Sequence, residues 1–177
     1  MKIRLFMQEG EEVLYKGYPE RAILILWFFG ALAIALFITF ILNTIITGIT
    51  ETFDTYALSY FIIFIPVLIL AFLYQVALRR SYHYYVTNER VIIEGGILLK
   101  KIKSVPYHKI TDVSIYQNIF ERIIGISTLN IHTAGTGMQI PEIRFFGLNE
   151  PEKPQSIIVN ELKAFKSDKK NFSTLSD

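Results

Sequence analysis

Two long uncharged stretches come before a region of alternating polar and apolar positions in this 177-residue chain. The first stretch covers residues 22–50 and the second covers residues 55–78. A helix of about 20 apolar residues crosses the ~30 Å hydrocarbon core of a bilayer, where backbone polar groups must be bonded within the helix. The pattern therefore predicts a transmembrane helical hairpin at residues 22–78, with helices at about 22–46 and 56–78.

Charged residues predict the orientation of this hairpin. Arg21 precedes it and Arg79-Arg80 follow it, whereas Glu51 and Asp54 are the only charges between the helices. Because basic residues stay on the cytoplasmic side, we expect both termini in the cytoplasm, the acidic loop outside, and the three arginines as anchors at the membrane exit. Aromatic residues near the same ends are expected to form an interfacial belt: Trp27, Tyr74, Tyr82, Tyr84 and Tyr85.

The hairpin is interpreted as an anchor. A cleaved signal peptide fits poorly, because residues 1–21 include four glutamates and the first apolar run exceeds a usual signal core. Neither run contains an ionisable side chain of the kind that marks transport paths. The notable polar or helix-breaking residues in the runs are interpreted as positions near helix ends or as a tolerated kink: Asn43, Pro66 and Gln75. A pair of small residues, Ala31 and Ala35, favours close helix packing.

Residues 79–166 predict a cytoplasmic domain of antiparallel strands followed by one helix. Aromatic and β-branched residues alternate at 81–88 and 90–99 around a turn at Asn88-Glu89, and again at 104–116, 126–133 and 142–148. Gly95-Gly96 indicates a bend, residues 100–103 an exposed turn, and residues 118–125 a short helical connection ended by Gly125. We expect these strands to form a curled sheet with an open end.

The C-terminal region changes to a helical period. Asn149 is a candidate cap, and the prolines that follow suit a first turn. Apolar residues recur at helical spacing at Ile157, Ile158, Leu162 and Phe165, which predicts a helix that plugs the open end of the sheet. Residues 167–177 read as a polar, frayed tail.

Several stretches of the chain resemble one known family. "YYVTNERVIIEGGILLKK", "SVPYHKITDVSIYQNIFERIIG" and "ISTLNIHTAGTG" look like the bacterial pleckstrin-homology-like (PH-like) proteins in which paired membrane helices precede the domain. The lead "QEGEEVLYKGYPER" resembles the start of the same proteins. The resemblance implies an α+β membrane protein with a PH-like antiparallel β-barrel or sandwich capped by a C-terminal helix. It also implies a multi-pass protein of prokaryotes with no activity commonly assigned.

Catalytic and metal chemistry find no support in the motifs. His83, His108 and His132 fall on three separate strand regions, and the chain has no cysteine, so they read as ordinary polar positions. "TAGTG" at 133–137 is followed by strand rather than helix, which indicates a hairpin turn instead of a phosphate cradle. Nothing marks Asp112 or Glu121 beyond surface polarity. We therefore expect a protein that is not an enzyme and that binds no cofactor or metal.

Lysines supply the remaining candidate site. From Arg79 onward the chain has 14 Lys and Arg against 10 Asp and Glu, and four lysines gather around one predicted hairpin: Lys100, Lys101, Lys103 and Lys109. Basic residues near a bilayer attract anionic headgroups, although a solvated turn explains the same residues, and the arginine pair expected downstream in eukaryotic phosphoinositide sites is missing. The modest basic excess argues against nucleic acid.

Two functions are therefore expected at the cell membrane. The first is a non-catalytic protein-interaction or scaffold module, which would contact an unidentified protein partner through an exposed sheet edge. The alternative is a module that contacts anionic lipid headgroups through Lys100, Lys101, Lys103 and Lys109. Membrane lipids are partners in both cases, and the helices and the domain are both compatible with homo-oligomers.

Overall fold

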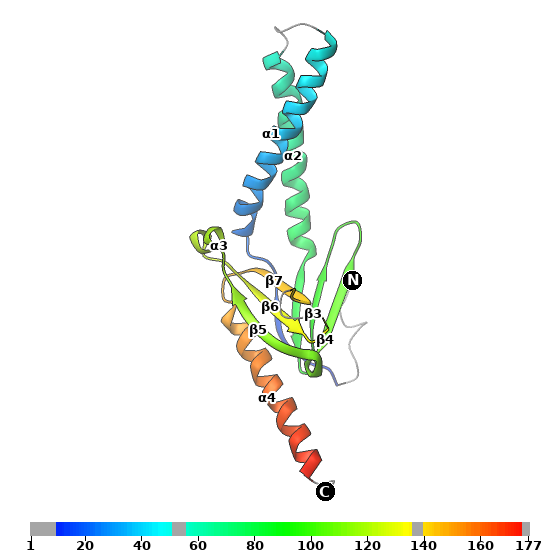
Figure 1. Ribbon diagram of the computed structural model, residues 1–177, viewed down its shortest axis with the longest axis vertical. Coiled ribbons are helices and arrows are strands. Elements are labelled where there is room, and N and C mark those ends of the chain that lie inside the picture. Colours follow the sequence, from blue (N-terminus) through cyan, green and yellow to red (C-terminus); the bar gives the residue numbers. More distant parts are fainter. Residues whose placement is uncertain (1–9, 51–55, 136–139, 175–177) are drawn as a thin grey trace.

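The computed structural model describes residues 10–50, 56–135 and 140–174 of the chain, and it places two long helices upright on a β-rich domain (Figure 1). Helix α1 (Ile23–Thr50) and helix α2 (Tyr56–Ser81) pack side by side. The expected acidic loop residues Glu51 and Asp54 lie outside the described residues. Helices and sheets thus divide along the sequence as the alternation of polar and apolar positions predicts.

A stripe of small and polar residues, four positions apart on α1, is buried in the helix pair. It consists of Ala31, Ala35, Thr39 and Asn43. Residues four apart lie on one helix face, and small side chains let two helix backbones approach closely. Asn43 is therefore a packing residue rather than a helix end, and its Nδ2 donates to the Thr39 carbonyl at 3.2 Å. Most large apolar side chains elsewhere on both helices point outward, and both helices are long and apolar enough to cross a membrane.

The strands form two antiparallel sheets. The four-stranded sheet has the order β1-β2-β3-β4, and the three-stranded sheet has the order β5-β6-β7. Strand bounds in the first sheet are β1 (Val13–Gly17), β2 (His83–Thr87), β3 (Arg90–Gly95) and β4 (Lys101–Pro106). Those in the second are β5 (Ile110–Tyr116), β6 (Ser127–Thr133) and β7 (Ile143–Leu148).

The two sheets face each other across one apolar core. Tyr84 of β2 stacks on Phe145 of β7 with ring centroids 4.6 Å apart, and both side chains are fully buried. The expected barrel is not closed among the described strands, since no ladder joins the two sheets. Pro106 ends β4 and lacks the N–H that a continuing ladder needs, and the short 3₁₀ helix η2 (Tyr107–Lys109) then redirects the chain. The prediction of one continuous strand over residues 104–116 is therefore wrong, because β4, η2 and β5 share this segment.

Two helices complete the domain. Helix α3 (Ile119–Ile124) is closed by a capping box between Asn118 and Glu121 and ends at Gly125, which has φ +77°. Helix α4 (Glu152–Thr174) contacts strands of both sheets and buries Ile158 in the core, as expected for a plug. The helix continues to Thr174, so the prediction of a frayed tail from 167 is wrong over most of that segment.

The reversal between β3 and β4 lies earlier than the lysines predict. Gly96 has φ +108°, and a Cβ there would lie 2.1 Å from the Leu99 carbonyl oxygen, so only glycine fits. The chain therefore turns over residues 96–100, and Lys101–Pro106 already belongs to strand β4. The expected turn at 100–103 is wrong because the glycine pair reverses the chain first.

Strand β1 was not predicted, and a buried ion pair attaches it to the sheet. It pairs antiparallel with β2, although both long helices lie between the two strands in the sequence. Glu11, just before β1, accepts from Arg90 at 2.9 Å (Nε) and 2.6 Å (Nη2), and the Thr87 hydroxyl donates to the same carboxylate at 2.8 Å. The hydrogen bonds that Arg90 donates to the Glu11 carboxylate raise the pKa of Arg90. Asn88 adds a bond from the Glu12 amide at 3.0 Å.

Candidate functional site at the junction of helices and domain

Both long helices join the domain through very short connections. Helix α2 ends at Ser81 and β2 begins at His83, while only residues 18–22 separate β1 from α1. The Glu20 amide donates to the Gly147 carbonyl at 2.7 Å, which ties the start of α1 to β7. Gly147 has φ +68°, and a Cβ there would lie 2.8 Å from Ile23 Cδ1. The helices are therefore held directly on the domain surface.

Phe146 of β7 is the centre of an aromatic cluster at this junction. Its ring centroid lies 4.7 Å from that of Tyr82, 5.8 Å from that of Tyr84 and 5.9 Å from that of Trp27. The Tyr84 hydroxyl donates to the Phe146 carbonyl at 2.9 Å, and burial raises the pKa of Tyr84 above its ordinary value of 10. The cluster therefore connects α1, β2 and β7, together with the residue that links α2 to β2.

Two members of the expected aromatic belt lie elsewhere. Tyr84 and Tyr85 are buried in the domain, because β2 is an inner strand covered on both faces. Trp27 and Tyr82 serve the junction, and the Gln75 side chain of α2 donates to the Trp27 carbonyl at 2.8 Å. Tyr74 alone of the five stays largely exposed on a helix. The belt prediction is thus wrong for Tyr84 and Tyr85.

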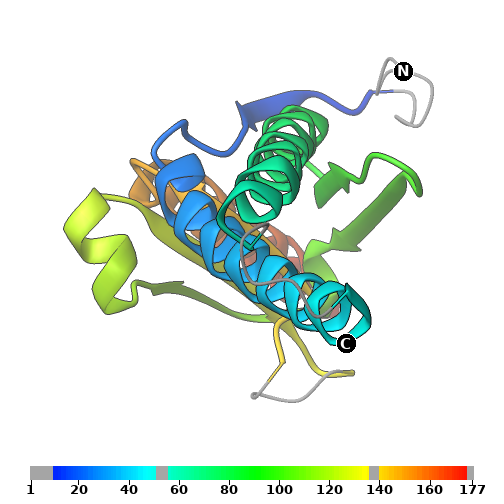
Figure 2. The ribbon, with the colours of Figure 1, turned by 90° about the horizontal axis from the view of Figure 1, so that it is seen from above.

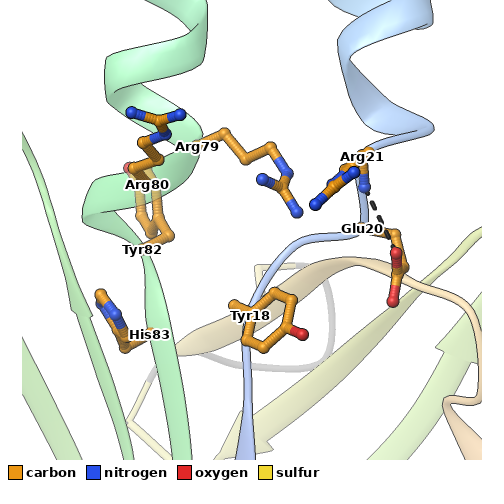
Figure 3. A pocket seen from close by; sticks show the side chains of 7 residues that line it. All are labelled: Tyr18, Glu20, Arg21, Arg79, Arg80, Tyr82 and His83. Carbon is orange, nitrogen blue, oxygen red and sulfur yellow. Dashed lines mark hydrogen bonds between the residues drawn. The ribbon is translucent and has the colours of Figure 1, made fainter.

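A pocket of about 360 Å³ opens at the junction, and the three predicted anchor arginines line it (Figure 3). In Figure 3, the guanidinium groups of Arg21 and Arg79 extend toward one another above the Tyr18 ring, while Arg80 points away. Helix pairing explains the convergence, since Arg21 lies two residues before α1 and Arg79 lies in the last turn of α2. The full lining consists of Tyr18, Glu20, Arg21, Arg79, Arg80, Tyr82 and His83.

The pocket carries an excess of positive charge. Among the described residues, no carboxylate lies within ion-pair distance of Arg21, Arg79 or Arg80. Glu20 is the one acidic residue in the lining, and its carboxylate accepts from the Arg21 backbone amide at 3.3 Å. The Arg79 guanidinium lies 5.9 Å from the Tyr18 ring centre, and its Nε is buried without a hydrogen-bond partner in the described part of the chain. Two guanidinium groups in this arrangement suit an anion between them.

The four candidate lysines do not gather at one place. Lys100 pairs with Glu94, and Lys103 Nζ lies 3.2 Å from Glu142 Oε1. Lys109 is on η2, beyond the opposite end of β4 from Lys101, a strand of six residues or about 20 Å away. Carboxylates thus engage two of the four lysines, and the strand separates the other two.

The residues weighed for catalysis are dispersed. His83 is on β2, His108 on η2 near the ring of Phe165, and His132 is buried on β6. In the described ranges, no three His, Asp or Glu side chains gather in a way that suits a metal ion. Glu121 caps α3 and accepts from Thr128 at 2.9 Å, so its role is structural. Residues 136 and 137 of the predicted glycine turn lie outside the described residues. The strands on either side of the turn, β6 and β7, pair antiparallel.

Part of this pocket was visible in the sequence. The sequence predicts the three arginines as separate membrane-exit anchors, but it does not predict that they converge or that Tyr18 and Glu20 join them. The available signal was the order of the segments, because two consecutive apolar runs that pair antiparallel bring their basic outer flanks, Arg21 and Arg79-Arg80, to the same end of the helix pair. The close connection of β1 to α1 then adds Tyr18 to the pocket.

The architecture defines a class: two apolar helices fused directly to a two-sheet domain closed by a C-terminal helix. A family model described as "Bacterial PH domain" matches residues 22–162. The chain belongs to this bacterial PH-domain family. A search of the curated proteins and a search of the solved structures found no significant match.

Proposed function

We propose that the chain is an integral membrane protein whose α1 and α2 cross the cell membrane and hold a non-catalytic PH-like domain at its cytoplasmic face. The length and apolar composition of both helices support two crossings, as do their outward-facing apolar side chains. Basic residues at the domain end of both helices support cytoplasmic termini. The domain lies directly against the bilayer in this arrangement, because the connections are too short to separate them.

Cysteine accessibility tests this orientation, since the chain has no cysteine of its own. Thr52→Cys is expected to react with a membrane-impermeant maleimide in intact cells, and Ser167→Cys only after the cells are permeabilised. Reaction of Ser167→Cys in intact cells would contradict the cytoplasmic location of the domain.

The function that the junction supports best is contact with anionic lipid headgroups. The observation that carries it is the pair of guanidinium groups, Arg21 and Arg79, which point at one another with no carboxylate from the described part of the chain between them. A lipid phosphate at this level of the membrane would neutralise both, with bidentate hydrogen bonds of the kind arginine favours. This proposal places the lipid contact at the arginines rather than at Lys100, Lys101, Lys103 and Lys109.

Quenching of the single tryptophan, Trp27, measures which lipids surround the junction. In vesicles containing the full chain, a brominated anionic lipid is expected to quench Trp27 more than a brominated neutral lipid at equal mole fraction. Each arginine contributes about 1 kcal/mol near the surface, or roughly a five-fold preference. Arg21→Gln/Arg79→Gln should remove the preference, and Lys163→Gln, exposed on α4, should keep it. Equal quenching by both lipids in the unmodified protein would refute the headgroup contact.

A protein-interaction role is the second candidate, and strand β4 favours it. Among the described strands β4 pairs with β3 alone, and residues 101–104 are all exposed. An extended segment with acidic side chains would add to this edge and meet Lys101 and Lys103. A photo-crosslinking residue at Ser104 is expected to give a discrete adduct in cells, and one at Ser167 none. Identical patterns at both positions would argue against a partner at β4.

A further inference from the structure

Two exposed apolar surfaces lie on the domain, and neither is used in its core. The first is the β3–β4 turn, where Leu98 is 90% and Leu99 75% exposed. The second is the outer face of α3, where Ile119 is 76%, Phe120 65% and Ile123 78% exposed. Large side chains this exposed in a soluble region usually mark an interaction surface when they cluster. Local residues fix the backbone of both segments. Only glycine fits at position 96 in the turn, and a capping box closes the first turn of α3.

Both surfaces face the side of the domain from which the helices emerge. In Figure 1, α3 and the β3–β4 turn rise to the level of the lower ends of α1 and α2. Figure 2, seen from above, places them on opposite sides of the helix pair. Contacts agree with the views, because α3 packs beside α1 and the turn lines a groove with residues of α2. The domain therefore has one apolar surface on each side of the helices.

The groove shows how far the β3–β4 turn reaches. It has a volume of about 420 Å³, and Leu98 and Leu99 line it together with Tyr74 and Leu78 of α2. Tyr74 precedes Arg79 by five residues, or about 7 Å along a helix. The turn therefore reaches past the arginines toward the membrane and extends the apolar surface of α2. Lys101 and Lys103 lie on the domain side of the same groove.

A lipid bilayer is the partner that fits both surfaces. One partner that touches both must be flat, must surround the helix pair and must accept apolar side chains, and the interfacial layer of a bilayer meets all three conditions. Lys101 follows the turn and forms no ion pair with a described carboxylate; its apolar stem would let the turn enter the interface while its ammonium group stays in water. Arg122 follows Phe120 on α3 in the same way.

We propose that the β3–β4 turn and α3 insert their apolar side chains into the cytoplasmic lipid interface, one on each side of the transmembrane helices. The proposal rests on the membrane crossing proposed above. The domain would then touch the membrane at three places, the helix junction and the two inserted surfaces, and these would fix its tilt. Residues on the opposite end, such as Ser167 of α4, would stay in water.

Fluorescence quenching of single labels on the full chain in vesicles tests the insertion. The label is placed at Leu98→Cys and Ile123→Cys, with Leu70→Cys in α2 as the membrane reference and Ser167→Cys as the aqueous control. These positions are exposed, so the label fits without disturbing the core. Labels at Leu98 and Ile123 are expected to shift to the blue and to lose intensity when the lipids carry bromine along their acyl chains, from the glycerol end to the chain ends, so that Leu70 is also within reach of the quencher. The label at Ser167 should show neither change.

Each pattern of quenching decides between the proposals. Quenching at Leu70, Leu98 and Ile123 but not at Ser167 supports the insertion. Quenching at Leu70 alone overturns it and leaves the membrane crossing intact. Quenching at only one of Leu98 and Ile123 overturns the paired contact, as does strong quenching at Ser167. If Leu70 is not quenched, the crossing fails and the insertion fails with it.

Discussion

Gly147 shows how one residue decides where a helix begins. It lies in β7 with φ +68°, and its carbonyl accepts from the Glu20 amide just before α1. A side chain at this position would be strained by the backbone and would also overlap Ile23, the first residue of α1. The glycine therefore allows β7 and α1 to touch at the base of the helix pair.

Gly147→Ala is expected to lower the free energy of local opening at the junction by about 2–3 kcal/mol, from left-handed backbone strain and from overlap with Ile23. Hydrogen exchange of the segments around residues 18–23 and 143–148, with the full chain in nanodiscs, measures this change. Gly125→Ala is the matched control, because Gly125 has φ +77° with open space around it. If Gly125→Ala lowers the free energy of local opening around residue 125 as much as Gly147→Ala lowers it at the junction, the overlap with Ile23 contributes nothing.

At the scale of elements, the strands that follow the helices could be predicted and strand β1 could not. Alternation and turn residues located β2, β3, β6, β7 and the short α3, because each signal lies within its own segment. Strand β1 is five residues long and pairs with a strand beyond both long helices, so no local pattern announces it. The turn was predicted too late in the chain, at Lys100–Lys103, although the local signal was present: Gly96 determines the position of the turn, and the charge of the lysines does not.

The Glu11–Arg90 pair is expected to hold β1 on the sheet. Glu11→Gln should lower the opening free energy of β1 by about 3 kcal/mol, because the change removes the buried carboxylate charge that accepts from the Arg90 guanidinium. Exchange of the amides in β1 and the facing part of β2 measures the loss. Glu142→Gln removes the more exposed pair with Lys103 and is expected to change opening by less than about 1 kcal/mol. Similar exchange in both variants would mean that β1 is held by its ladder alone.

At the scale of the whole molecule, the helices and the domain are joined as one body through side chains as well as through short connections. Phe146 contacts residues from α1, from the start of the domain and from β2, so its ring couples the direction of the helices to the tilt of the sheets. The sequence marked Trp27 and Tyr82 as residues near the membrane exit, yet their common partner lies far along the chain. Only the paired helices and sheets bring the three rings together.

Loss of this ring should loosen the domain on its anchor without unfolding it. In the cysteine-free chain, spin labels at Leu70→Cys and Ser167→Cys report the distance between α2 and α4, and we expect one narrow distribution in nanodiscs. Phe146→Ala should broaden it, because three aromatic contacts at the junction are lost while the core residue Phe145 stays in place. Phe37→Ala, an exposed aromatic change on α1, is the control and should leave the width unchanged. An unchanged width in Phe146→Ala, with normal exchange in the sheets, would assign the rigidity to the chain connections and the lipid contacts instead.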